Sequence, residues 1–143
     1  MNASAIESRE LACGCLVSVD DRRIVLAIPN TDYQLHLVPT VPASQITTPP
    51  GKRIYGVIEA KALRMHNAHG GGLYIEPVYG VPRIVQGRAL AVDKERNRLL
   101  MNLAVPVWVT MHEGQRAEDI ALNQLANFYV ETGATFTPLP DDT

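Results

Sequence analysis

The residues best suited to chemistry lie in one stretch, where two histidines precede the only glycine triplet of the chain. His66 and His69 are three positions apart, and Glu76 or His112 could complete a metal site with them. However, neither the H-E-x-x-H pattern of zinc enzymes nor a pair of cysteines accompanies these histidines. We therefore expect no metal here, and a metal-dependent enzyme that uses His66 and His69 is the third hypothesis for function.

The glycine triplet Gly70-Gly71-Gly72 invites comparison with loops that bind phosphate. Such loops hold phosphate oxygens on backbone amides at the start of a helix, whereas here a strand-like segment, Leu73 to Gly80, follows. The G-x-x-x-x-G-K-[ST] and G-x-G-x-x-G patterns are both absent. The triplet instead predicts a wide hairpin turn with positive φ, at the tip of a hairpin from Arg64 to Glu76.

Nucleophilic catalysis has no support in the sequence. Cys13 and Cys15 have no activating base nearby in the sequence, and on an extended strand they lack the geometry of an unstrained disulfide. The serines do not occur in a G-x-S-x-G motif; they are Ser4, Ser8, Ser18 and Ser44. We predict no catalytic residue, no bound metal and no cofactor.

Charge is distributed unevenly along the chain, although its net value is only −2. Residues 52–98 hold nine bases and four acids (+5), residues 1–51 three bases and five acids (−2), and residues 99–143 one base and six acids (−5). A basic middle can contact an anionic partner, or the acidic ends can neutralise it within the fold or across an oligomer. The candidate ligand-binding residues are Arg64, His66, His69, Gly71, Tyr74, Glu76, Arg83 and Arg88.

The elements that position these residues are predominantly β. Alternating and β-branched runs predict strands from Gly14 to Ile28, from Tyr33 to Leu37 and from Arg53 to Asp93, with a proline-rich loop over 39–51. A change in the parity of the apolar positions predicts a β-bulge near residue 62. Further strands are predicted in the runs RLLMNLAV, VWVTM and FYVETGATF.

An internal repeat organises the strands. The segment from Gly14 to Asp20 matches that from Gly87 to Asp93 in its Gly, Val and Asp, and each precedes a strand that ends Leu-Ala-Ile-Pro or Leu-Ala-Val-Pro. A looser third copy runs from Gly56 to Pro77. Three similar hairpins predict one supersecondary unit used repeatedly, with Gly87 at a bend or a close contact.

Only one helix is predicted, from Gln115 to about Asn127, on the spacing of Ala117, Ile120, Ala121 and Leu125. Residues 1–12 are expected to be a loose arm, and residues 138–143 an acidic tail. The fold class predicted is therefore all-β: a single domain over 1–143, a small barrel of repeated hairpins with one short C-terminal helix. This architecture resembles the OB-fold in broad outline, a resemblance that carries no functional residue with it.

The sequence has no long apolar run and no signal-peptide pattern, so we expect a soluble, cytoplasmic protein without a membrane partner. The first hypothesis for function is a non-catalytic binding and assembly module. It would contact its partner through the 61–88 region and self-associate through the apolar run around Trp108. The alternative is an OB-like protein that binds single-stranded nucleic acid, with Arg64, Arg83 and Arg88 on phosphates and Tyr74 or Tyr79 stacked on a base.

Overall fold

The computed structural model describes residues 8–140, and these form a mostly-β protein with one mixed sheet of eleven strands. The strands are β1 (Ala12–Val19), β2 (Ile24–Ala27), β3 (Gln34–Pro39), β4 (Arg53–Asn67), β5 (Tyr74–Glu76), β6 (Tyr79–Gly80), β7 (Ile84–Asp93), β8 (Arg98–Asn102), β9 (Pro106–Thr110), β10 (Leu125–Val130) and β11 (Thr135–Pro138). Three short 3-10 helices accompany them: η1 (Ser8–Glu10), η2 (Ala43–Gln45) and η3 (Ala117–Asp119). Within residues 8–140, no helix has the length and apolar character needed to cross a membrane.

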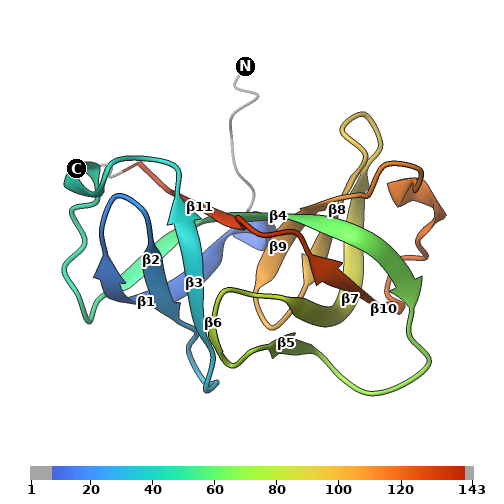
Figure 1. The fold of residues 1–143 in the computed structure, drawn as a ribbon, viewed down its shortest axis with the longest axis horizontal. Helices are drawn as coiled ribbons and strands as arrows, with labels where there is room; N and C mark the ends of the chain where they lie inside the picture. The colour runs from blue at the N-terminus through green and yellow to red at the C-terminus, as the bar shows by residue number, and fades with distance from the viewer. Residues whose placement is uncertain (1–7, 141–143) are drawn as a thin grey trace.

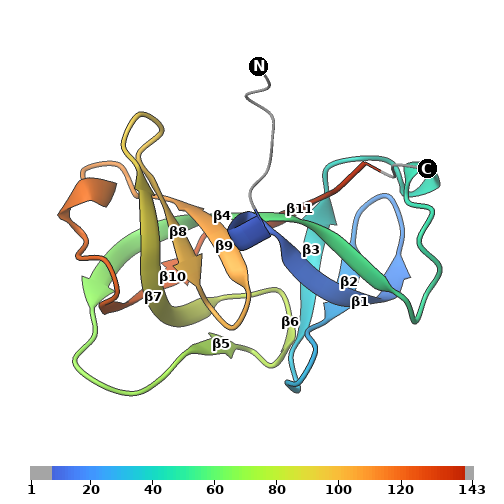
Figure 2. The same cartoon turned by 180° about the vertical axis from the view of Figure 1, so that it is seen from behind.

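Strand β4 organises the sheet because it pairs with four other strands. Its first half pairs with β1 and β11, and its second half pairs with β9 and β10. Two rings of pairings result, which share β4: the first ring is β1-β2-β3-β11-β4, and the second ring is β4-β10-β7-β8-β9. Figure 1 shows β4 running across the molecule from the strands of the first ring to those of the second, and Figure 2 shows the same arrangement from behind.

The repeat predicted from the sequence coincides with these rings. Each ring contains a three-stranded antiparallel meander, β1-β2-β3 or β7-β8-β9. The register slips between Leu16 and Ser18 in the first meander and between Ala89 and Ala91 in the second, which are the same positions of the repeat. The third, looser copy is not a hairpin, since β4 and β5 are not paired with each other.

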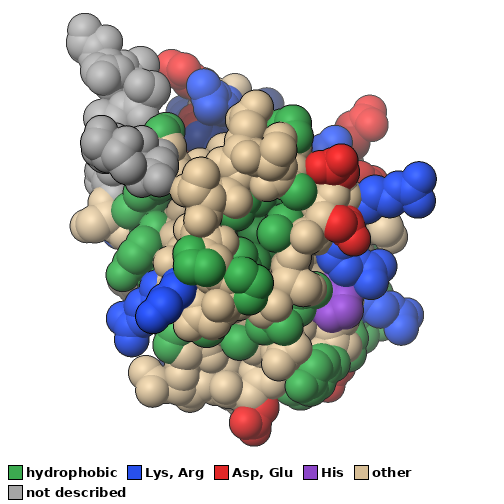
Figure 3. All heavy atoms as spheres, turned by 90° about the vertical axis from the view of Figure 1, so that its left-hand side faces the viewer, with side chains coloured by type: hydrophobic (Ala, Val, Ile, Leu, Met, Phe, Trp, Pro, Cys, Tyr) green, Lys and Arg blue, Asp and Glu red, His purple; other side chains and the backbone are tan. Residues whose placement is uncertain are grey.

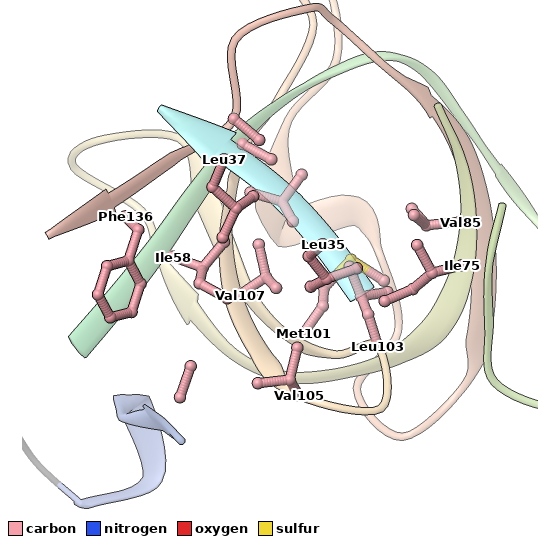
Figure 4. Packing of buried hydrophobic residues seen from close by; sticks show 14 of the residues in the cluster. Leu35, Leu37, Ile58, Ile75, Val85, Met101, Leu103, Val105, Val107 and Phe136 are labelled. Carbon is pink, nitrogen blue, oxygen red and sulfur yellow. The ribbon is translucent and has the colours of Figure 1, made fainter. Parts of the chain in front are cut away.

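The buried side chains of both rings form one continuous hydrophobic cluster. Leu35 of the first ring and Leu103 of the second line the same small internal cavity, which Ile75 of β5 also borders. Figure 4 shows these side chains pointing toward one another. The rings are therefore packed together rather than merely linked.

The predicted bulge in β4 is confirmed. Phe128 and Val130 of β10 stand opposite Met65 and Ala62, so three steps along β4 match two steps along β10. As a result, Leu63 and Arg64 are both exposed, although they are neighbours on a strand.

The predicted helix from Gln115 to Asn127 is wrong. Only the single turn of η3 is helical, and β10 begins at Leu125. The cause is tertiary: the Gln115 side chain pairs with the backbone of Met65, accepting from its N–H at 2.8 Å and donating to its carbonyl at 2.9 Å. Asn123, with φ of 68°, then turns the chain into β10 in a conformation that a helix does not allow.

Parts of the predicted terminal arm and tail belong to regular structure within residues 8–140. Residues 1–7 and 141–143 lie outside the described residues. Residues 8–10 form η1 and Ala12 already belongs to β1, so this part of the arm is not loose. Pro138 closes β11, so it belongs to the sheet and not to a tail.

Candidate functional site

Four strands of the second ring and its margin form an open outer surface that carries most of the candidate residues. We define the β10 face as the outer surface of β4 residues 61–67, β10, β7 residues 84–88 and β5. In this order each strand pairs with the next, and all three pairings are antiparallel. Side chains of residues directly opposite each other in antiparallel strands point to the same side, so the register identifies the residues that share this face.

One row across the β10 face is held together by hydrogen bonds. His66, Asn127, Gln86 and Tyr74 are successive partners across the four strands. The Asn127 side-chain amide donates to the Gln86 carbonyl oxygen at 3.1 Å. Because Gln86 is only 4% exposed and all its polar atoms have partners, this row is the fixed centre of the face.

The next row is open to solvent and centred on Tyr129. Tyr129 stands opposite Ile84 of β7 and beside the β4 bulge, where Leu63 and Arg64 protrude. Its side chain is 57% exposed, which is unusual for a tyrosine in the middle of a sheet. The row therefore offers an accessible aromatic ring with a guanidinium group on the neighbouring strand.

The glycine loop does not form the predicted hairpin tip. Gln86 donates its side-chain N–H groups to the carbonyls of Gly70 at 3.1 Å and Gly72 at 2.9 Å, so the loop crosses over the outside of β7. Gly71 lies between these carbonyls with φ of 88°, in the region that favours glycine. A Cβ there would also lie 3.2 Å from the Gln86 amide nitrogen, so glycine fits closely at this crossing.

The two arginines of the segment after Pro82 have different environments. Arg88 continues the β10 face on β7, and its guanidinium donates to the Asn123 carbonyl at 2.7 Å, which fixes it against the turn before β10. Arg83 lies at the margin, where it borders a shallow groove of about 200 Å³ with Glu76, Pro77 and Ile84. No carboxylate within residues 8–140 lies within 4.0 Å of the Arg83 or Arg88 guanidinium.

Five of the eight candidate residues thus lie on or at the edge of one face: Arg64, His66, Tyr74, Glu76 and Arg88. Arg83 borders it, and His69 and Gly71 belong to the loop that crosses β7. Among the described residues, no three His, Cys, Asp or Glu side chains gather into a possible metal site. Residues 8–140 therefore supply no third ligand for His66 and His69.

Sequence reasoning missed Tyr129, Asn127 and Gln86, which form the middle of the face. Asn127 was overlooked because the predicted helix extended to it, whereas Tyr129 lay in a predicted strand that the sequence did not connect with the other candidates. The signal was present, since the run Leu-Ala-Asn-Phe-Tyr-Val joins aromatic and β-branched residues in a strand-like pattern.

The apolar run around Trp108 does not form an open surface. Val107 and Val109 point into the core. Trp108 lies on the outside of β9 but is only 8% exposed, because Arg98 stacks on its ring at 4.0 Å and its indole N–H donates to Glu10 at 2.9 Å. The surface that was predicted to self-associate is therefore covered within the chain.

The two aspartates of the repeat lie at equivalent turns, one after β1 and one after β7. Asp20 accepts hydrogen bonds from the backbone N–H groups of Arg22 and Arg23, and these bonds hold the pKa of the Asp20 carboxyl below its usual value. Asp93 accepts a hydrogen bond from the Arg98 guanidinium at 2.9 Å, which is the main cause of its lowered pKa. Both carboxylates therefore stabilise hairpin turns, as their positions in the sequence indicated.

Comparison of the chain with protein-family models, with curated proteins and with solved structures gives no match. The function of the β10 face must accordingly be argued from its own geometry.

Proposed function

We propose that this protein is a non-catalytic binding module made of two small barrels, OB-like in outline, which share β4. We further propose that single-stranded nucleic acid is the ligand of the β10 face. The architecture supports the first part, since each ring of five strands contains a meander and is completed by strands from elsewhere in the chain, as in a Greek-key barrel.

The observation that carries the proposal is the exposed ring of Tyr129 beside Arg64 on an open sheet. Proteins that bind single strands without sequence preference combine aromatic rings under the bases with cations along the backbone. Lys61 and Arg64 lie on the strand next to Tyr129, and neither has a carboxylate partner within 4.0 Å among residues 8–140. Their charges are thus available to phosphates.

Glu76 is the acid of this face, and it lies at its edge on β5. Glu131, which follows β10, borders a groove with Lys61, so it offsets part of the positive charge beside Tyr129. A strand that passes over Tyr129 therefore meets the Arg64 guanidinium, with these two acids at the margins of the face.

Fluorescence anisotropy with a labelled single-stranded oligonucleotide of mixed sequence tests the proposal. Replacing Tyr129 with alanine should weaken binding by roughly tenfold, since a stacked base contributes about 1–3 kcal/mol, whereas Tyr129→Phe should retain most of the affinity. Arg64→Ala should reduce the slope of log K against log salt by about 0.7. Arg22→Ala, in the β1–β2 turn, is the matched control and should leave both quantities unchanged.

The proposal fails if no single-stranded oligonucleotide binds at about 50 mM salt, where phosphate contacts are strong. It also fails if binding occurs but Tyr129→Ala and Arg64→Ala bind as tightly as the natural chain. Duplex DNA of the same sequence should bind less well, because its bases are not available to stack on a protein ring.

A second candidate is self-association through the 61–88 region, and a different observation favours it. Three apolar side chains are exposed in the segment around β6: Val78, Val81 and Tyr79, the last 63% exposed. Such a cluster is typical of a protein contact. Light scattering tests it: a mass of 15.7 kDa at tens of micromolar would exclude it, and a dimer abolished by Tyr79→Ser would support it.

A further inference from the structure

A groove of the first ring lies at the opposite end of β4 from the β10 face. Its volume is about 400 Å³, and we call it the β4 groove. It is lined by Val41, Gln45, Ile46, Thr47, Thr48, Arg53, Ile54, Tyr55, Pro138, Leu139 and Pro140. Figure 3 looks at the side of the molecule formed by the first ring, where apolar side chains occupy the middle and charged side chains lie toward the margins.

The lining of the β4 groove suits one end of a nucleic-acid strand. Tyr55 is 45% exposed, and Arg53 is the adjacent outward residue on the same strand. Within residues 8–140 no acidic side chain lines the groove, and no carboxylate lies within 4.0 Å of Arg53. An accessible ring beside an unpaired guanidinium is the same combination as Tyr129 with Arg64.

The repeat relates the two strands that carry these combinations, although Tyr55 itself corresponds to Asn127 and not to Tyr129. Cys13 of β1 pairs with Tyr55 of β4, and Gln86 of β7, its counterpart in the repeat, pairs with Asn127 of β10. Strand β4, which carries Tyr55, thus pairs with the first strand of the first meander. In the same way β10, which carries Tyr129, pairs with the first strand of the second meander.

The two regions are connected along one strand. The outward residues of β4 run from Arg53 and Tyr55 at one end to Arg64 and His66 at the other. From Tyr55 to Arg64 there are nine residue steps, about 30 Å at roughly 3.3 Å per residue. A ligand of at least this length can therefore reach both regions.

A polar groove of about 310 Å³ lies between the two regions. It contains Lys61 together with two acids, Glu59 and Glu131. Glu59 is near the Arg98 guanidinium at 3.4 Å, which offsets part of its charge. Glu131 is exposed and would repel a phosphate that crosses this groove, so it should limit the affinity of a ligand that spans both regions.

We propose that the β4 groove is a second contact region for the same single strand, so that one chain binds a long strand at two linked places. This inference rests on the proposed function of the β10 face. Linking two contacts raises affinity for a ligand long enough to reach both and leaves a short ligand unaffected.

The test compares two lengths of labelled single-stranded oligonucleotide, about 6 and about 24 nucleotides, because one OB-like barrel covers about 4–16 nucleotides. Tyr55→Ala should weaken binding of the long strand by roughly fivefold or more and leave the short strand unchanged. Tyr129→Ala should weaken both. Glu131→Gln should strengthen binding of the long strand more than that of the short one, and Tyr55→Phe should behave like the natural chain.

The outcomes separate this inference from the proposed function. If Tyr129→Ala weakens both lengths while Tyr55→Ala changes neither, the β4 groove is not part of the site, and the β10 face still is. If Tyr55→Ala weakens the short strand as much as the long one, the two regions do not act as linked contacts, and the inference is overturned. If neither length binds at about 50 mM salt, both proposals fail, and a protein partner becomes the better explanation of the surface.

Discussion

Gln86 shows how one buried polar side chain can determine the course of a whole loop. Its amide fills the space between β10 and the glycine loop, receiving a hydrogen bond from Asn127 and giving two to the carbonyls of Gly70 and Gly72. The loop has no strand of its own between β4 and β5, so these bonds substitute for strand pairing. The position of His69 in space depends on them.

Replacing Gln86 with leucine should release this loop. The free energy of unfolding should fall by about 1–2 kcal/mol, because hydrogen bonds from a buried amide are lost and Asn127 loses its partner. Hydrogen exchange of residues 68–73 should become faster at the same time. Gln45→Leu, at an exposed position, is the control and should change stability by less than about 0.5 kcal/mol. Unchanged exchange in the loop would show that other contacts hold it.

The lowered pKa of the Asp93 carboxyl should make the stability of the protein depend on pH in the acidic range. The folded protein favours the charged form of the Asp93 carboxylate. The stabilisation that Asp93 contributes is therefore fully present above the pKa of an unfolded aspartate, about 3.9. It is lost as the pH falls through the lower pKa of the folded state. Asp93→Asn should therefore cost about 1 kcal/mol at pH 7, as expected for a charged hydrogen bond at a side chain that is still 25% exposed. The difference between variant and natural chain should shrink as the pH falls below about 4 and should be lost once the pH is below the folded pKa.

Asp20→Asn provides the matched comparison for this pH series. Asp20 is bound mainly by two backbone N–H groups, which the side-chain oxygen of asparagine also accepts, whereas Asp93 faces a guanidinium charge. Chemical denaturation of both variants between pH 2 and 8 should show a smaller, flatter effect at Asp20. Equal effects at the two sites would mean that the Arg98 charge is not the cause.

At the scale of elements, the two meanders depend on glycines where strands approach closely. A Cβ on Gly87 would contact the Asn102 carbonyl oxygen and would lie 2.5 Å from Leu103 Cδ2. A Cβ on Gly14, the same position of the repeat, would lie 2.9 Å from Leu26 Cβ. Each glycine thus admits a neighbouring strand or loop at a distance that no other residue allows.

Gly87→Ala should consequently destabilise the protein by about 3 kcal/mol or more, because backbone and not a flexible side chain is in the way. Urea denaturation measures the loss, and a fall in soluble yield would accompany it. Gly70→Ala is a suitable control, since nothing lies within 4 Å of its added methyl group and its backbone does not need positive φ. A mild effect at Gly87 would show that β8 can shift to make room.

The elements predicted correctly from the sequence are those whose signals are local. The hairpin from β1 to β2, the bulge in β4 and the close contact at Gly87 follow from alternation, parity and a glycine within a strand. The helix prediction failed because the apolar spacing around Ala117 and Ile120 could not reveal that Gln115 binds the backbone of Met65, fifty residues away. This error left Asn127 out of the candidate site, whereas Tyr129 already lay in a predicted strand.

The candidate site was predicted only in part for the same reason. The charge of residues 52–98 pointed to strands that form most of the β10 face, and Arg64, His66 and Tyr74 do share this face. Their common orientation depends on β10, which is inserted between β4 and β7 from far along the chain. Strand pairings between segments so far apart in the sequence leave no local pattern. The sequence could therefore supply the residues of the face but not their arrangement.

At the scale of the whole molecule, β4 makes the two rings dependent on each other. It supplies a strand to both, and its inward residues belong to the single hydrophobic cluster. Ile58, near the middle of β4, borders the internal cavity together with Leu37 of the first ring and Val107 of the second. Neither ring can close without this strand, so we expect one cooperative unfolding transition in place of two.

Ile58→Ala tests this expectation. The substitution should lower the free energy of unfolding by about 2–5 kcal/mol, the range for a large buried side chain truncated to alanine. If the rings unfold together, hydrogen exchange should accelerate by the same factor in β2 of the first ring and β8 of the second, because both exchange through the same global opening. Val57→Ala, which faces outward from the same strand, should produce a much smaller change in both. Acceleration confined to one ring would instead show two independent units joined by a common strand.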